Sequence, residues 1–72
     1  MRVYIILSTK NITTMDVNIL LSVINTKLRN EFSSISLLCA SFEVDEKLLV
    51  IRLEKDGYVY KIEQNQFRKA IN

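Results

Sequence analysis

Histidine and proline are absent from the 72 residues, and glycine and cysteine occur once each. Without histidine, the chain cannot build a Cys/His zinc site or the Ser–His and Cys–His pairs that activate nucleophiles. One glycine is too few for a glycine-rich loop that binds phosphate groups. One cysteine excludes a disulfide within the chain. These absences predict that the protein is not an enzyme and that it binds no metal or cofactor.

The single cysteine, Cys39, lies within the apolar run SLLCASF, residues 36–42. A free cysteine in such a run packs as a small hydrophobic residue more often than it serves as a reactive thiol. An unpaired cysteine is also typical of proteins in a reducing compartment. We therefore expect Cys39 to be structural and the protein to be cytoplasmic.

Long hydrophobic runs are lacking as well. The first ten residues, MRVYIILSTK, contain an apolar run of five. A secretory signal needs about 7–15 apolar residues and a membrane span needs about 20. The sequence therefore predicts neither secretion nor a membrane partner.

The chain is short, and we expect it to form one α+β domain over residues 1–72. Hydrophobic residues make up 49% of the sequence, which is a generous share for so small a body. Domains of this size have limited interiors and often depend on disulfides, metals or oligomerisation. Since the first two are excluded, oligomerisation as a homodimer is the expected support.

Hydrophobic periodicity predicts one long helix and several strands. Apolar residues recur at spacings of three and four over 17–28, so we expect an amphipathic helix over about 14–31 that is capped by Thr13. Asp56-Gly57 is a hairpin-turn signal. Strands are expected over 3–7, 35–44, 47–55 and 58–62, and a short helix over about 65–71. The predicted fold is a four-stranded mainly antiparallel sheet with the long helix across one face and the short helix at the C-terminus, in the order β-α-β-β-β-α.

More apolar surface is predicted than these elements can cover. Alternation along the strands assigns Ile51 and Ile62 to the face beneath the long helix, and leaves other apolar side chains on the opposite face. The helix also carries a second apolar stripe on its far side. A loop or the C-terminal segment could fold over that stripe, or a partner could cover it. The predicted protein interface consists of Met15, Ile19, Val23, Tyr4, Ile6, Leu37, Leu48 and Val50.

The basic residues suggest an alternative, nucleic-acid binding. From Lys55 onward, four basic residues face two acidic ones, so the whole net charge of +2 lies in this tail. Tyr58 and Tyr60 are expected to face the core and therefore cannot stack on bases. We find no RNA-recognition or helix-turn-helix pattern, and Arg52 is expected to pair across strands with Glu43 and Glu54. The residues predicted for a nucleic-acid surface are Arg52, Lys55, Lys61, Arg68 and Lys69.

The favoured interpretation is a small non-enzymatic protein that binds another protein. A compact α+β module with surplus apolar surface suits an inhibitor, a regulator or an accessory protein. The sequence is rich in Ile, Asn and Lys, which is typical of AT-rich coding DNA. That composition indicates a viral, mobile-element or low-GC microbial source.

Overall fold

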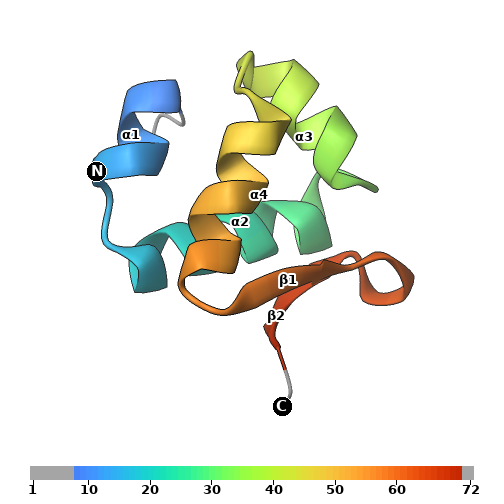
Figure 1. Cartoon of the computed structure of the whole chain (residues 1–72). Helices are drawn as coiled ribbons and strands as arrows, with labels where there is room; N and C mark the ends of the chain where they lie inside the picture. Colours follow the sequence, from blue (N-terminus) through green and yellow to red (C-terminus); the bar gives the residue numbers. More distant parts are fainter. Residues whose placement is uncertain (1–7, 71–72) are drawn as a thin grey trace, which may run out of the picture.

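Four helices precede a β-hairpin in the part of the chain that the structure, a computed structural model, describes, residues 8–70. Figure 1 shows α4 in front of α2, with the hairpin crossing below both helices. The elements are α1 (Thr9–Thr14), α2 (Val17–Asn30), α3 (Ile35–Phe42), α4 (Glu46–Lys55), β1 (Tyr58–Lys61), the 3-10 turn η1 (Ile62–Gln64) and β2 (Gln66–Lys69).

Each helix begins at a side chain that accepts hydrogen bonds from the first turn. Asp16, for example, accepts from the backbone N–H groups of Asn18 and Ile19, at 3.0 and 3.2 Å. Such caps satisfy N–H groups that have no partner inside the helix, and each contributes about 1 kcal/mol. The four capping residues are Ser8, Asp16, Ser34 and Asp45.

The predicted four-stranded sheet is wrong. The segments expected as strands over 35–44 and 47–55 form α3 and α4, and the sheet in the described residues has two strands. In α3 the inward-facing residues are spaced at three, four and seven positions, which is the helical period. Short apolar runs fit both periods, so their pattern alone does not separate a helix from a strand. The inward-facing residues of α3 are Ile35, Leu38, Cys39 and Phe42.

Helix α2 confirms the predicted long helix, although it begins at Val17 and its cap is Asp16 instead of Thr13. The strand predicted over 58–62 is confirmed as β1. The helix predicted over 65–71 is wrong, because β2 pairs antiparallel with β1, with Tyr60 opposite Phe67. The strand predicted over 3–7 lies outside the described residues.

Two backbone turns shape the hairpin and its connection to α4. Gly57 has φ of +90°, a conformation that favours glycine, but it joins α4 to β1 and not two strands as predicted. The hairpin itself turns through η1 and Asn65, whose φ is +53°. Asparagine tolerates this left-handed region better than most residues.

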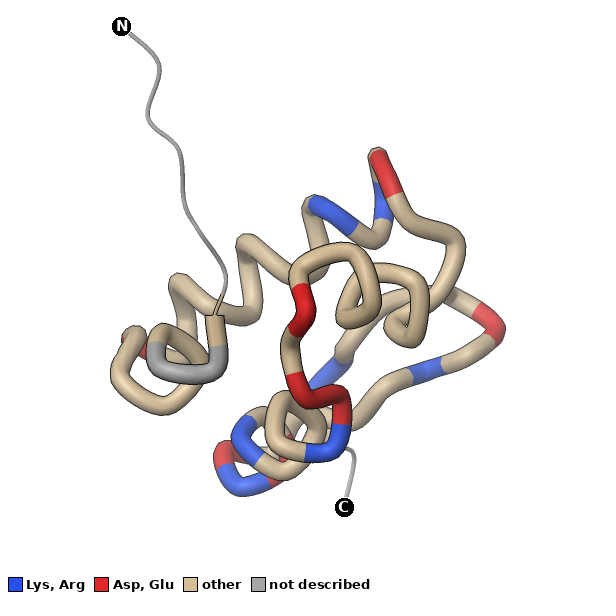
Figure 2. The backbone as a smooth tube through the Cα atoms, turned by 90° about the horizontal axis from the view of Figure 1, so that it is seen from above, with Lys and Arg blue, Asp and Glu red and all other residues tan. Residues whose placement is uncertain are grey.

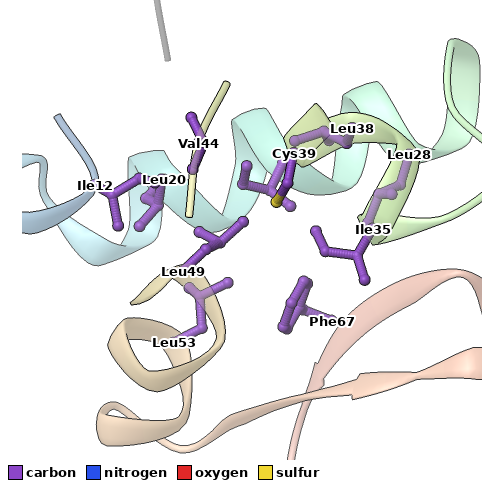
Figure 3. Close-up of a cluster of buried hydrophobic side chains, with 11 residues drawn as sticks. Ile12, Leu20, Leu28, Ile35, Leu38, Cys39, Val44, Leu49, Leu53 and Phe67 are labelled. Carbon is purple, nitrogen blue, oxygen red and sulfur yellow. The ribbon is translucent and has the colours of Figure 1, made fainter. Parts of the chain in front are cut away.

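One hydrophobic core joins the four α-helices and the two strands. Figure 3 shows its side chains pointing from the helices and from β2 into a common interior. Phe67 is 1% exposed, and its ring centroid lies 5.2 Å from that of Tyr60. Burying a large apolar side chain contributes roughly 1.5–3 kcal/mol, so this cluster holds the fold together. Its members are Ile12, Leu20, Ile24, Leu28, Ile35, Leu38, Cys39, Val44, Leu49, Leu53 and Phe67.

Candidate interaction surface on a helix-turn-helix

Helices α3 and α4 are joined by a three-residue turn, 43–45, whose positions each have a defined role. Glu43 adopts a left-handed conformation with φ of +55°. The N–H of Val44 then donates to the carbonyl of Cys39 at 2.9 Å, which closes α3 in a Schellman-type cap. The Val44 side chain is buried in the core, and Asp45 caps α4.

This arrangement is a helix-turn-helix, in which two helices are joined by a turn of three to four residues. Both helices were predicted to be strands, so no helix-turn-helix was expected from the sequence. The signal was present in the chain, as Ser34 and Asp45 each stand directly before a helix as a capping residue.

Amide side chains fasten the hairpin to α2. Asn25 on α2 binds both backbone groups of Phe67, and Gln66 donates its amide to the carbonyl of Asn25 at 2.8 Å. Asn65 donates to the carbonyl of Leu28 at 3.0 Å and to that of Phe32 at 2.9 Å. The Asn25 bonds use backbone groups of β2 that an edge strand would otherwise leave open, and the Gln66 and Asn65 bonds use carbonyls of α2 and of Phe32. Together they fix the hairpin beside the helix-turn-helix.

The residues of the predicted interface differ in their exposure. Ile19 and Leu37 are each 53% exposed, whereas Met15, Val23 and Val50 pack against the core. The stripe predicted on the long helix is therefore reduced to Ile19. Leu48 is half-buried, and Tyr4 and Ile6 lie outside the described residues.

Two exposed apolar residues were missed. Ile51 is 53% exposed and Ile62 is 78% exposed, although both were assigned to the core face of the sheet. In a helix, Leu49 and Leu53 share the buried side and Ile51 points away from it. Strand β1 ends at Lys61 and Ile62 begins the 3-10 turn η1, so the alternation of inward and outward side chains does not extend to Ile62.

The predicted basic residues are also dispersed. Arg52 forms an ion pair with Asp56 and donates to the carbonyl of Met15 at 3.2 Å, so it does not pair with Glu43 or Glu54 as expected. Figure 2 shows basic and acidic positions interspersed around α4 and the hairpin. By the strand register, Lys61 and Arg68 share the hairpin face opposite Phe67, and Lys69 lies on the other face. Lys55 lies on α4, in a hollow of about 570 Å³ that Ile51 also lines.

The start of α4 is acidic. Glu43, Asp45 and Glu46 lie within four residues, and Glu46 accepts a hydrogen bond of 2.9 Å from the Ser36 hydroxyl. In DNA-binding helix-turn-helix proteins the N-terminal residues of the second helix contact base edges, close to the phosphates. Over residues 35–56 there are five acidic residues against three basic ones. The carboxylates at this position repel phosphates instead of neutralising them.

Residues 14–67 match the family described as Domain of unknown function (DUF4250). The chain belongs to the DUF4250 family. The DUF4250 match includes both helices of the helix-turn-helix and reaches Phe67, so the bonds between Asn25 and Phe67 lie within the family domain. No curated protein and no solved structure matches the chain.

The buried side of the helix-turn-helix in this DUF4250 domain contains Cys39, which is 3% exposed. Burial, with smaller effects of Glu46 and Asp45, raises the pKa of its thiol to about 11. The thiol therefore stays protonated near neutral pH and is a poor nucleophile. Among the described residues, no cluster of three His, Cys, Asp or Glu side chains could hold a metal ion. Over the same part of the chain, no helix has both the length and the apolar character that crossing a membrane requires.

Proposed function

We propose that this DUF4250 protein is a small non-enzymatic binding module that acts as a homodimer and presents exposed apolar side chains to a protein partner. The observation that carries the proposal is the exposure of Leu37 and Ile51, one on each helix of the helix-turn-helix. Large apolar side chains at exposed positions of a small domain are typical of interaction surfaces. A role as an inhibitor, regulator or accessory protein fits this surface.

The proposed interactions are transient. Removing the exposed half of Leu37 or Ile51 from water is worth about 1 kcal/mol for each side chain. Association costs an estimated 4–15 kcal/mol, so a complex must cover several such side chains and pair polar groups as well. We expect homodimers that dissociate on dilution instead of permanent ones.

Light scattering from about 20 µM to about 2 mM protein tests the homodimer. We expect the weight-average mass to rise with concentration. Single substitutions Ile19→Asp, Leu37→Asp, Ile51→Asp and Ile62→Asp then show which exposed side chain the association needs. A mass that stays monomeric over the whole range contradicts the homodimer.

The protein partner is tested separately by crosslinking in the native cell, with the wild-type chain compared with Leu37→Asp and Ile51→Asp. A specific partner is lost with either substitution and is retained with a charge change at an unrelated position, Lys61→Glu. Equal capture by all four proteins contradicts the proposed surface.

A second candidate function is nucleic-acid binding, and the helix-turn-helix arrangement is the observation that favours it. The acidic start of α4 argues against this function, and the hairpin would have to supply the phosphate contacts through Lys61 and Arg68. Fluorescence anisotropy with duplex DNA at low and high salt separates the two functions. Nucleic-acid binding predicts an affinity that falls steeply with salt and is lost in Lys61→Glu/Arg68→Glu, whereas the protein-binding module shows neither effect.

We infer a cytoplasmic location from the single unpaired cysteine, because such a thiol is stable in a reducing compartment. The viral or mobile-element source stays a proposal that rests on the Ile, Asn and Lys content. Sequencing the DNA that flanks the gene tests this source directly.

A further inference from the structure

One side of α4 carries a short stripe with opposite charges at its two ends. Lys47, Val50, Ile51 and Glu54 are spaced at three, four and seven positions, so they lie on the same side of the helix. Ile51 is 53% exposed, and Val50 packs partly against the core. Lys47 and Glu54 are exposed. The stripe thus has a basic end, an apolar centre and an acidic end.

The two charges of the stripe are placed against the helix dipole. Lys47 lies in the first turn of α4 and Glu54 in the last, which is the unfavourable placement relative to the helix dipole. The other charges of this helix follow the favourable order, with Glu46 at the start and Arg52 and Lys55 at the end. Among residues 8–70, neither Lys47 nor Glu54 has an ion-pair partner.

We propose that α4 pairs antiparallel with α4 of a second copy of this chain, about a two-fold axis that passes between residues 50 and 51. This register brings Lys47 against the partner subunit's Glu54, and by symmetry Glu54 against the partner subunit's Lys47. Val50 and Ile51 of both copies form one apolar cluster at the axis, so in the homodimer Leu37 on α3 is the exposed apolar side chain that remains for the protein partner. The inference rests on the homodimer proposed above and specifies its contact surface.

Charge complementarity selects a second copy as the occupant of this surface. A two-fold axis requires the same stripe to match itself when reversed, and a basic end opposite an acidic end fulfils that requirement. The exposed side of α4 therefore fits a reversed copy of itself.

The expected dimer is weak. Helix α4 has 10 residues, which corresponds to a length of about 15 Å. Pairing along this length buries less than the roughly 1,200 Å² of a small specific interface. We expect a dissociation constant between about 10 µM and about 1 mM.

Charge reversal tests the register. Lys47→Glu alone places two carboxylates together at both ends of the pairing, and Glu54→Lys alone places two ammonium groups together. Each single substitution is expected to weaken the dimer by about tenfold in light scattering, because two ion pairs become two repulsions. The double variant Lys47→Glu/Glu54→Lys restores both attractions, and its dissociation constant is expected within about threefold of the wild-type value. Arg29→Glu, a charge reversal at an exposed position on α2, is the control and leaves the dissociation constant within about threefold.

The melting temperature of the dilute monomer is measured for each single reversal, so that a loss of folding is not mistaken for a loss of pairing. Each reversal introduces the sign that the helix dipole favours at its end of α4, but it also adds a charge beside others of the same sign. These two effects oppose each other, so we expect the melting temperature of the dilute monomer to stay close to the wild-type value. Ile51→Asp is a second route to the same surface and is expected to abolish the dimer at all measured concentrations.

Two results would overturn the inference while leaving a homodimer in place. The first is a wild-type dimer that neither single reversal weakens, and the second is a double variant that is as weak as the single ones. A wild-type chain that remains monomeric up to about 2 mM would remove both the pairing and the homodimer on which it rests.

Discussion

Asn25 on α2 binds both backbone groups of Phe67 on β2, a residue 42 positions further along the chain. Its amide oxygen accepts from the Phe67 N–H at 2.8 Å, and its amide nitrogen donates to the Phe67 carbonyl at 3.0 Å. The side chain therefore satisfies the backbone of a nearly fully buried residue at the free edge of the hairpin. This contact holds the hairpin in its place beside the helix-turn-helix.

Replacing Asn25 with Ala is expected to lower the free energy of unfolding by about 2–4 kcal/mol, because it leaves a buried N–H and a buried carbonyl without partners. Urea denaturation followed by circular dichroism measures this change. Asn18→Ala is the matched control, since Asn18 is exposed on the same helix, and its effect is expected within about 0.5 kcal/mol. Equal losses in the two variants would contradict the role of Asn25.

Glu43 and Asn65 both have a left-handed backbone, with φ of +55° and +53°, but glycine is expected to change stability in opposite directions at the two positions. Glu43→Gly relieves backbone strain in the turn of the helix-turn-helix and is expected to stabilise the domain by about 0.5–1 kcal/mol. Asn65→Gly gains less relief, because asparagine already tolerates this region, and it loses the bonds to Leu28 and Phe32, so a net loss of about 1–3 kcal/mol is expected. Thermal denaturation of both variants measures the change in melting temperature. A change of the same sign in both would contradict the different roles given to Glu43 and Asn65.

Asp45 is the capping residue on which the start of α4 depends. Its carboxylate accepts from the backbone N–H of Leu48 at 3.1 Å. Asp45→Ala is expected to cost about 1 kcal/mol, and Asp45→Asn, which keeps the accepting oxygen, only a few tenths. Chemical denaturation of the two variants gives the comparison. Equal costs would show that the negative charge of Asp45, and not its hydrogen bond, is what matters at this position.

Titration of Cys39 is expected to lower the stability of the domain at alkaline pH. Burial raises the pKa of its thiol in the folded protein to about 11, from 9.0 for an unperturbed thiol. The folded state thus holds the proton more tightly, and its contribution is complete below pH 9 and decreases as the pH rises towards 11. Over this range the loss is expected to approach about 2–3 kcal/mol.

Cys39→Ala provides the control for this pH dependence, since tyrosines and lysines titrate in the same range. Urea denaturation at pH 8 and about pH 10.5 is expected to give a smaller loss for Cys39→Ala than for the wild type. Alkylation with iodoacetamide gives a second readout, because the native thiol is expected to react far more slowly than the thiol in urea. Identical pH dependences in the two proteins would contradict the assignment to Cys39.

Parts of this fold could be predicted because the local pattern admits one interpretation. The 17–28 stretch repeats its apolar residues at helical spacing over three turns, and α2 follows it. Tyr58 to Lys61 alternates as a strand, and Gly57 supplies the turn before it. The run SLLCASF is ambiguous, because its apolar residues fit the period of a strand and that of a helix over so short a length. That ambiguity led to a sheet where the chain forms a helix-turn-helix.

The sequence by itself excluded a disulfide within the chain, a Cys/His zinc site and a Ser–His or Cys–His nucleophile, because the chain has no histidine and one cysteine. It also determined α2 and β1, since their patterns are long or clear enough to be local properties. Only the tertiary structure decided which sides of α3 and α4 face the core, and hence that Ile51 lies at the surface. The reason is that these short helices gain most of their stability from packing against residues distant in sequence. The bonds between Asn25 and Phe67 belong to the same class, because no local pattern specifies a contact across 42 positions.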